Sequence, residues 1–191
     1  AKKIGEMMVR KSFSSPSRKN RTFGEELIKV SNLSVHSKDF FGTSLSNINF
    51  SVRVGEILGI GGVAGNGQDE FLGALSGETK TSQKTITLSD QHIGHLRPNQ
   101  RRELGLRAAP EERLGHAAAP AMSLVENTLM TSHSKDVIDK WGIINFKNIS
   151  TKTSRIVSEF DVRTPTLDNT AASLSGGNLQ KFVIGREILE K

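Results

Sequence analysis

The chain has 191 residues, no cysteine and a formal net charge of +6. This length fits one domain with a hydrophobic core. The lack of cysteine excludes disulfides and thiolate metal sites. No apolar run approaches the ~20 residues of a membrane span, so any membrane role is predicted to be peripheral.

The basic charge is concentrated near the N-terminus. Residues 1–30 contain eight Lys or Arg against three Glu, a net charge of +5 that leaves +1 for residues 31–191. Residues 1–26 are rich in Ser, Lys and Arg, and they are predicted to form a basic flexible linker. Such a linker could touch anionic lipid or nucleic acid, but a solvated tether is the simpler interpretation.

Regular structure is predicted to begin near Leu27. Residues 27–35 and 45–54 alternate apolar and polar side chains and are rich in β-branched residues, which predicts two half-buried strands. Phe40 and Phe41 lie in the loop between them. One of these aromatics could stack on an adenine base; the alternative is an ordinary place in the core or at its rim.

A glycine-rich stretch follows, EILGIGGVAGNGQDEFLGALSG, over residues 56–77. It predicts a short buried strand near residues 57–60, then a loop, then a helix. Gly62 and Gly67 have the spacing of the phosphate-binding pattern G-x-x-x-x-G-K-[ST]. Backbone N–H groups of such a loop converge on an anion at the positive end of the helix.

Two side chains depart from that pattern. Gln68 replaces the lysine that would reach the phosphates, and Asp69 replaces the hydroxyl that would hold magnesium. Because a charge-assisted hydrogen bond contributes roughly 1.5–3 kcal/mol, its loss weakens triphosphate binding about ten- to a hundredfold. We expect weak nucleotide binding and little hydrolysis at this loop. The alternative is a glycine-rich turn without a ligand.

Strands and helices alternate through the middle of the chain. The predicted elements are a strand over 85–88, a short helix over 98–104, a strand over 106–113 and helices over 123–130 and 146–161. Ser123 and Glu126 form a capping box that predicts the start of the helix over 123–130. The alternation favours an α/β fold with a largely parallel sheet.

The predicted strand over 106–113 would bring charged side chains to one end of that sheet. Glu111, Glu112 and Arg113 follow Pro110 directly. Ligands and coupling loops gather where the strands of open α/β sheets end. A surface ion pair is the alternative interpretation.

A second anion-binding pattern lies near the C-terminus, LSGGNLQK at residues 174–181, followed by a helical run over 182–190. Ser175, Gly176 and Gly177 would present a hydroxyl and free N–H groups at the start of that helix. The pattern is common alone, but about a hundred residues after a glycine-rich phosphate loop it is specific.

These motifs together resemble the ATP-binding cassette family. GVAGNGQD is similar to a degenerate Walker A loop, APEERLGH to the segment around the Q-loop, and LSGGNLQK to the signature motif. With GEMMVR and SLVENTLM, they resemble the second cassette of the tandem ATPases that drive bacterial simple-sugar and nucleoside importers. The resemblance implies a P-loop NTPase fold with a mostly parallel core sheet, an antiparallel β subdomain and a helical subdomain at about residues 120–175. Residues 1–26 would link two cassettes, and residues 27–191 would form the second one.

The resemblance also implies roles for particular residues. The degenerate nucleotide loop comprises Gly62, Val63, Ala64, Gly65, Asn66, Gly67, Gln68 and Asp69. The signature motif comprises Leu174, Ser175, Gly176, Gly177, Asn178 and Gln180. The Q-loop region comprises Pro110, Glu111, Glu112 and Arg113, with Glu111 where the family's glutamine is expected. Phe40 or Phe41 would be the aromatic that stacks on adenine, and no metal ligand is assigned.

In this family two cassettes dimerise head to tail, and each ATP lies between the loop of one and the signature motif of the other. Ser175, Gly176 and Gly177 would then complete the partner cassette's site. The implied cofactors are ATP and Mg²⁺ in the parent complex. The implied partners are a first cassette, transmembrane permease subunits and, indirectly, a solute-binding protein, at the cytoplasmic face of a bacterial inner membrane, with no nucleic acid.

The sequence ends at Lys191, about where the family supplies the Walker B strand. We therefore expect a truncated cassette that does not hydrolyse ATP alone, with apolar surface exposed near residues 57–60. The leading interpretation is an ATP-binding part of a sugar or nucleoside importer. The alternative is a non-catalytic docking or regulatory module. A chromosome-associated ATPase would need basic residues on the globular part.

Overall fold

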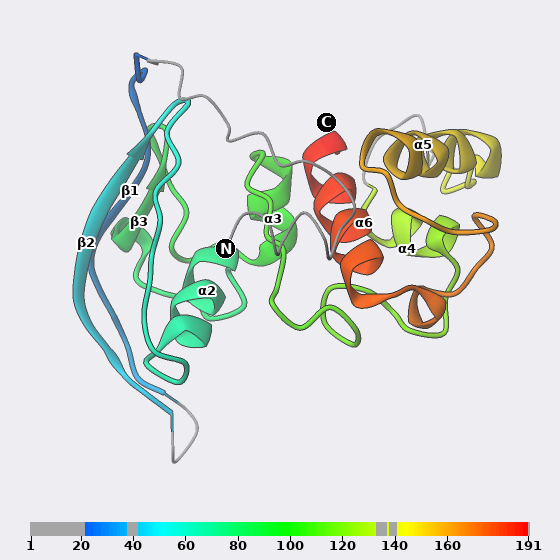
Figure 1. Cartoon of the computed structure of the whole chain (residues 1–191). Helices are drawn as coiled ribbons and strands as arrows, with labels where there is room; N and C mark the ends of the chain where they lie inside the picture. The colour runs from blue at the N-terminus through cyan, green and yellow to red at the C-terminus, as the bar shows by residue number, and fades with distance from the viewer. Residues whose placement is uncertain (1–21, 38–41, 133–136, 138–140, 191) are drawn as a thin grey trace.

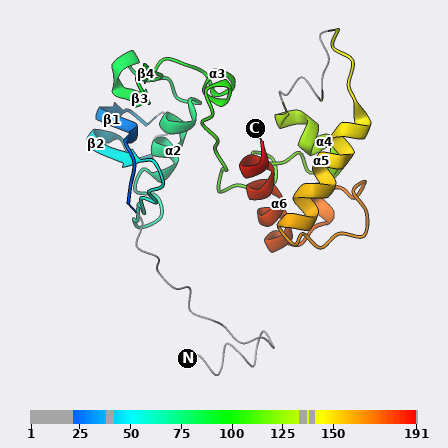
Figure 2. The ribbon, with the colours of Figure 1, turned by 90° about the horizontal axis from the view of Figure 1, so that it is seen from above.

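The computed structural model describes residues 22–37, 42–132, 137 and 141–190. Most of the basic linker, Phe40 and Phe41 lie outside the described residues. The chain forms a β-rich part and a helical part, which lie on opposite sides of the views in Figures 1 and 2.

The β-rich part is a four-stranded sheet in the order β2-β1-β3-β4. Its strands are β1 (Glu26–Val35), β2 (Leu45–Arg53), β3 (Ile86–Leu88) and β4 (Gln91–His92). Neighbouring strands are antiparallel throughout, with Val30 opposite both Phe50 and Ile86. The first two predicted strands and the one over 85–88 are thus confirmed, with boundaries shifted by one residue.

An irregularity in β1 changes which side chains face the core. The buried residue is Val30 before the irregularity, and Leu33 and Val35 after it. Asn32 has a left-handed backbone (φ 52°) and donates its N–H to Asn49 Oδ1 at 2.8 Å. The extra residue shifts the period-2 alternation by one, so buried positions change from even to odd numbers.

Helix α2 (Gln68–Ser76) packs on the sheet, and α3 (Pro98–Glu103) lies beyond it (Figure 1). Ala74 is buried against the sheet, and the rings of Phe50 and Phe71 have centroids 5.6 Å apart. Fully buried Arg101 donates from Nη1 to the carbonyl oxygens of Ala74 (2.6 Å) and Leu75 (2.7 Å). Its cation therefore satisfies the negative end of α2.

The helical part contains α4 (Leu124–Thr131), α5 (Phe146–Glu159) and α6 (Gly176–Leu189). The predicted capping box is confirmed: Ser123 Oγ accepts from Glu126 N–H at 3.1 Å, and Glu126 Oε2 accepts from Ser123 N–H at 2.7 Å. Gly185 lets α6 approach the ring of Phe160, because a Cβ there would lie 2.7 Å from that ring. The buried apolar residues of this cluster are Ala117, Ala118, Leu124, Ile156, Val162, Ala171, Leu179, Phe182 and Val183.

Two predicted strands are wrong. Residues 56–60 form no strand, and Ile57 and Ile60 are 93% and 59% exposed. Residues 106–113 also run without a strand. An apolar or β-branched run becomes a strand only where a second strand pairs with its backbone, and none of the named strands pairs with either segment.

The expected core sheet needs a corresponding correction. The sheet formed by the described residues is antiparallel, which confirms the expected antiparallel β subdomain. The expected mostly parallel core sheet is absent from the described residues. The expected exposure of apolar surface near residues 57–60 is confirmed by the same two isoleucines. Within the described ranges, no helix combines the length and apolar character needed to cross a membrane.

Candidate functional site

The glycine-rich loop connects residues 56–60 to α2 by two left-handed glycines. Gly65 has φ 84° and Gly67 has φ 95°, a backbone region that favours glycine. A Cβ at Gly67 would also lie 2.7 Å from the Leu45 side chain. Thr43 Oγ1 donates to the Gly65 carbonyl at 2.8 Å. The antiparallel hairpin therefore supports the loop directly.

The side chain of Gln68 folds back onto this loop. Its Nε2 donates to the Val63 carbonyl at 2.8 Å, and its Oε1 accepts from Asn66 N–H at 3.0 Å. The amide also lies against Gly62, where a Cβ would come within 2.6 Å of Nε2. A neutral internal group thus occupies the position where the phosphate-binding pattern has a lysine.

Carboxylates surround the start of α2. Asp69 and Glu70 lie in its first turn, and Ser37 Oγ donates to Glu70 Oε1 at 2.9 Å. Two negative charges already interact favourably with the helix dipole there. A further anion would be repelled by them.

An open cavity of about 970 Å³ separates this loop from the predicted Q-loop region. Pro110, Glu111, Glu112 and Arg113 line its far wall, so the structure brings these two predicted sites together. His116 Nε2 lies 2.9 Å from Glu78 Oε1 at the same cavity. The three carboxylates of Glu78, Glu111 and Glu112 at this cavity outnumber the one guanidinium of Arg113.

The LSGGN stretch forms the exposed start of α6. Ser175 is the N-cap residue, and its hydroxyl makes no hydrogen bond to the first N–H groups of the helix. Instead Asn178 Nδ2 donates to Ser175 Oγ at 3.0 Å, while Asn178 Oδ1 accepts from Arg163 N–H at 3.1 Å. Because the first N–H groups of a helix have no intrahelical acceptor, those after Ser175 remain available to an outside anion.

The remaining predicted residues of this stretch differ in exposure. Gly176, Gly177 and Gln180 are exposed, whereas Leu174 is half-buried. No residue of 174–180 lines the cavity at the glycine-rich loop, among the residues that the structure describes. The two anion-binding patterns of this chain therefore do not form one site within the chain.

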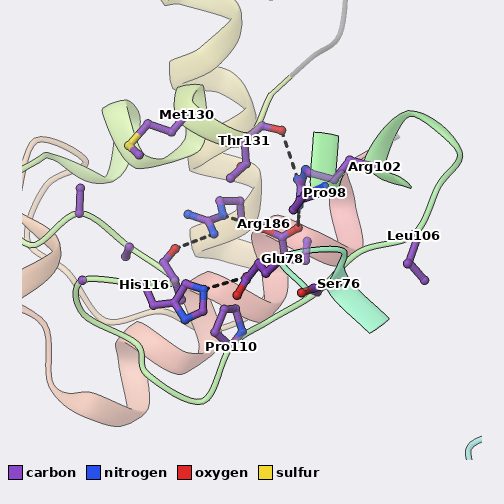
Figure 3. Close-up of a pocket in the computed structure, with 16 residues that line it drawn as sticks. Ser76, Glu78, Pro98, Arg102, Leu106, Pro110, His116, Met130, Thr131 and Arg186 are labelled. Atoms are coloured by element: carbon purple, nitrogen blue, oxygen red, sulfur yellow. Dashed lines mark hydrogen bonds and ion pairs between the residues drawn. The ribbon is translucent and has the colours of Figure 1, made fainter. Parts of the chain in front are cut away.

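Figure 3 shows a buried charge network that the sequence analysis missed. It lines a cavity of about 230 Å³ between the two parts of the chain. Arg102 Nη1 contacts Glu187 Oε2 at 2.5 Å, and Arg186 Nη2 donates to the Ala117 carbonyl at 2.8 Å. Burial lowers the pKa of Arg186, and the Glu187 carboxylate opposes that shift. The only sign of this network in the sequence was the pair of adjacent opposite charges, Arg186 and Glu187, in an apolar helix.

Metal-binding side chains are not clustered in the described part of the chain. No group of three or more His, Asp or Glu is placed to hold an ion there. Asp69 is exposed at the position where the pattern has a magnesium-binding hydroxyl. The carboxylate of Asp69 adds negative charge at this loop.

Several import ATP-binding proteins are similar in sequence to this chain. The chain is 37% identical over 166 residues to the guanosine import ATP-binding protein NupO of Bacillus subtilis, covering 86% of this chain and 32% of that protein. It is 32% identical over 187 residues to the nucleoside import ATP-binding protein NupA of Lactococcus lactis, covering 97% and 37%. A glucose import ATP-binding protein of Haloferax volcanii is 31% identical over 188 residues, covering 97% and 34%. The chain therefore spans about a third of the length of these relatives.

Solved structures share the fold at low sequence identity. A dimeric bacterial ABC transporter cassette superposes with a TM-score of 0.66 at 17% identity, covering 85% of this chain and 69% of that one. An ATP-binding cassette of another ABC transporter gives 0.63 at 19% identity, covering 86% and 65%. The family model described as ABC transporter matches residues 45–191. The chain therefore belongs to the ABC transporter family and has the α/β P-loop NTPase fold of its ATP-binding cassettes.

Proposed function

We propose that this chain is the second, degenerate cassette of an import ATPase, and that its signature motif completes the ATP site of a partner cassette. The observation that carries the proposal is the exposed start of α6, where the Ser175 hydroxyl accepts from the Asn178 side chain and makes no hydrogen bond to the first N–H groups of the helix. The hydroxyl and the first N–H groups are thus free of intrahelical acceptors. They suit a phosphate presented from another chain.

The chain's own glycine-rich loop supports the part of this proposal that places ATP in the partner cassette and not in this chain. ATP and Mg²⁺ do not fit it, because Gln68 occupies Asn66 N–H, no lysine is present and Asp69 adds negative charge. No hydrolytic step is therefore derived at this loop. ATP and Mg²⁺ would be held by the partner cassette, with Ser175 to Gly177 contacting the terminal phosphate.

The relatives support a proposal for the wider assembly. Proteins named for guanosine, nucleoside and glucose import match over most of this chain, so we infer a sugar or nucleoside importer. Its partners would be a first cassette and transmembrane permease subunits, with a solute-binding protein acting indirectly. The cassette would be peripheral, at the cytoplasmic face of the membrane. Residues 1–26 would link it to the first cassette, residues 27–191 would form the cassette, and about 120–175 its helical subdomain.

An ATPase assay tests the central claim. The rate of the purified first cassette is measured with and without this chain, and with its Ser175→Arg variant. We expect stimulation by the native chain, because the signature motif supplies transition-state contacts, and loss of at least tenfold of that stimulation in the variant. Ser154→Arg, at an exposed position of α5, is the matched control. Equal stimulation by both variants would reject the role of Ser175.

A second candidate function is a non-catalytic docking or regulatory module. The acidic wall and neutral loop amide favour it, because they suit protein contact more than triphosphate binding. It predicts association of the two chains, measured by analytical ultracentrifugation, without any change in the ATPase rate. Stimulation that depends on Ser175 would exclude it.

A further inference from the structure

Both polar atoms of the Gln68 side chain are used within its own loop. Oε1 accepts from Asn66 N–H and Nε2 donates to the Val63 carbonyl. In a phosphate-binding loop, N–H groups of this kind point at the anion. Here the N–H of Asn66 is already paired inside the loop, with Gln68 Oε1 at 3.0 Å and with the Val63 carbonyl at 3.2 Å.

The space beside Gln68 is available only because residue 62 is glycine. A Cβ at Gly62 would lie 2.6 Å from Gln68 Nε2, which is closer than non-bonded atoms approach. The backbone of Gly62 does not have positive φ. Glycine at this position therefore leaves room for the Gln68 amide, and an added Cβ would displace the end of that flexible side chain.

The charges around the loop favour a neutral group over an anion. Asp69 and Glu70 lie in the first turn of α2, and Glu111 and Glu112 line the cavity with Arg113, so carboxylates are in excess. An anion that entered would approach these carboxylates. A neutral amide satisfies the loop without that repulsion.

We propose that Gln68 is an internal ligand of the glycine-rich loop that keeps the loop closed without nucleotide. The inference rests on the proposed function in that this loop is the degenerate one. A nucleotide that binds must first displace the Gln68 amide, so two hydrogen bonds oppose its entry. The loop then keeps one shape through the partner's ATP cycle, and its contact surface does not depend on nucleotide.

The test combines Gln68→Ala with Gly62→Ala. The first variant removes the amide, and the second displaces it from its present position by steric contact. Amide hydrogen exchange of residues 61–67 is measured without nucleotide, and affinity is measured by titration with a fluorescent ATP analogue. The full chain is used, with Gln83→Ala, an exposed glutamine distant in sequence, as control.

Both variants are expected to speed exchange of the loop and to tighten binding of the analogue, each by about two- to tenfold. The double variant should equal either single variant, because both remove the same interaction. If Gln68→Ala does not fold, Gly62→Ala carries the test. Slow exchange of Asn66 N–H is also expected in the native chain.

Unchanged exchange in both variants, or unprotected Asn66 N–H in the native chain, would overturn the inference. Faster exchange with unchanged affinity would also overturn it, because Gln68 would then stiffen the loop without opposing nucleotide binding. If none of the proteins is saturated by the ATP analogue, the affinity is counted as unchanged. The proposed function is tested separately, because stimulation of the partner depends on Ser175 and not on this loop.

Discussion

The guanidinium Nη1 of Arg113 donates a hydrogen bond to the carbonyl oxygen of Gly176 over 3.1 Å. Arg113 also lines the cavity that faces the glycine-rich loop, whereas Gly176 is the first residue of α6. One side chain therefore connects the predicted Q-loop region to the predicted signature motif within the chain. We expect it to hold the start of α6 in the position that a partner's phosphate would meet.

Replacing Arg113 should loosen the start of α6 with little effect on global stability. Arg113→Ala is expected to speed amide exchange of residues 174–179 about two- to tenfold, because the tether to Gly176 is lost. The free energy of unfolding should change by less than about 1 kcal/mol, since the contact is exposed. Arg155→Ala, which removes an exposed ion pair on α5, is the control. Equal exchange in the two variants would show that Arg113 does not hold the helix.

Restoring the phosphate-binding side chains should restore affinity at the loop. Gln68→Lys with Asp69→Ser is expected to tighten triphosphate binding about ten- to a hundredfold, because a charge-assisted hydrogen bond is added and a repulsive carboxylate is removed. Isothermal titration calorimetry measures the effect. Gln68→Lys alone should give part of the gain. No gain in either protein would count against this stretch as a phosphate loop.

Arg101 should be essential to the β-rich part. Arg101→Met removes the donors that satisfy the carbonyls of Ala74 and Leu75, and each unsatisfied buried group costs about 1–3 kcal/mol. We expect a loss of about 3 kcal/mol, measured by urea denaturation. Arg101→Lys should not rescue stability, because an ammonium group lacks the planar fork that reaches both carbonyls and Gly94 O. Full rescue by lysine would mean that charge alone matters.

Gly185 should tolerate no larger residue. Gly185→Ala is expected to cost about 1–3 kcal/mol, because its Cβ would lie 2.7 Å from the Phe160 ring in a packed core. Gly177→Ala, on the same helix with no atom near the added Cβ, should lose no stability, since alanine favours helix. Thermal denaturation of the two variants gives the comparison. A similar loss in both would point to a backbone effect.

The capping box should make stability depend on acid pH. Hydrogen bonds from the backbone and side chain of Ser123 lower the pKa of Glu126. A lowered folded-state pKa contributes stability above about pH 4.3, the usual value for glutamate, and that contribution is lost as pH falls through the lower folded value. The difference in unfolding free energy between the native chain and Glu126→Gln should therefore shrink as the pH falls below about 4.3 toward the lower folded-state pKa. A difference independent of pH would contradict this origin.

The sequence alone predicted those features that depend on neighbouring residues. Alternation predicted β1 and β2, and the three-residue spacing of Ser123 and Glu126 predicted the start of α4. The Ser-Gly-Gly turn likewise indicated the exposed start of α6. In each case the interacting groups are a few residues apart, so the pattern contains both partners.

Tertiary structure decided what depends on groups distant in the chain. Residues 57–60 and 106–113 read as strands, but strand formation needs a paired backbone that no local pattern supplies. The partners of Arg101 and Arg186 lie up to 27 and 69 residues away, so their burial was not predictable. Gln68 lies only a few residues from Val63 and Asn66, yet its contacts depend on left-handed backbone at Gly65 and Gly67. The sequence determined which side chain replaces the lysine, and the folded loop decided that it binds its own backbone, because only the closed turn brings that amide to its acceptor and donor.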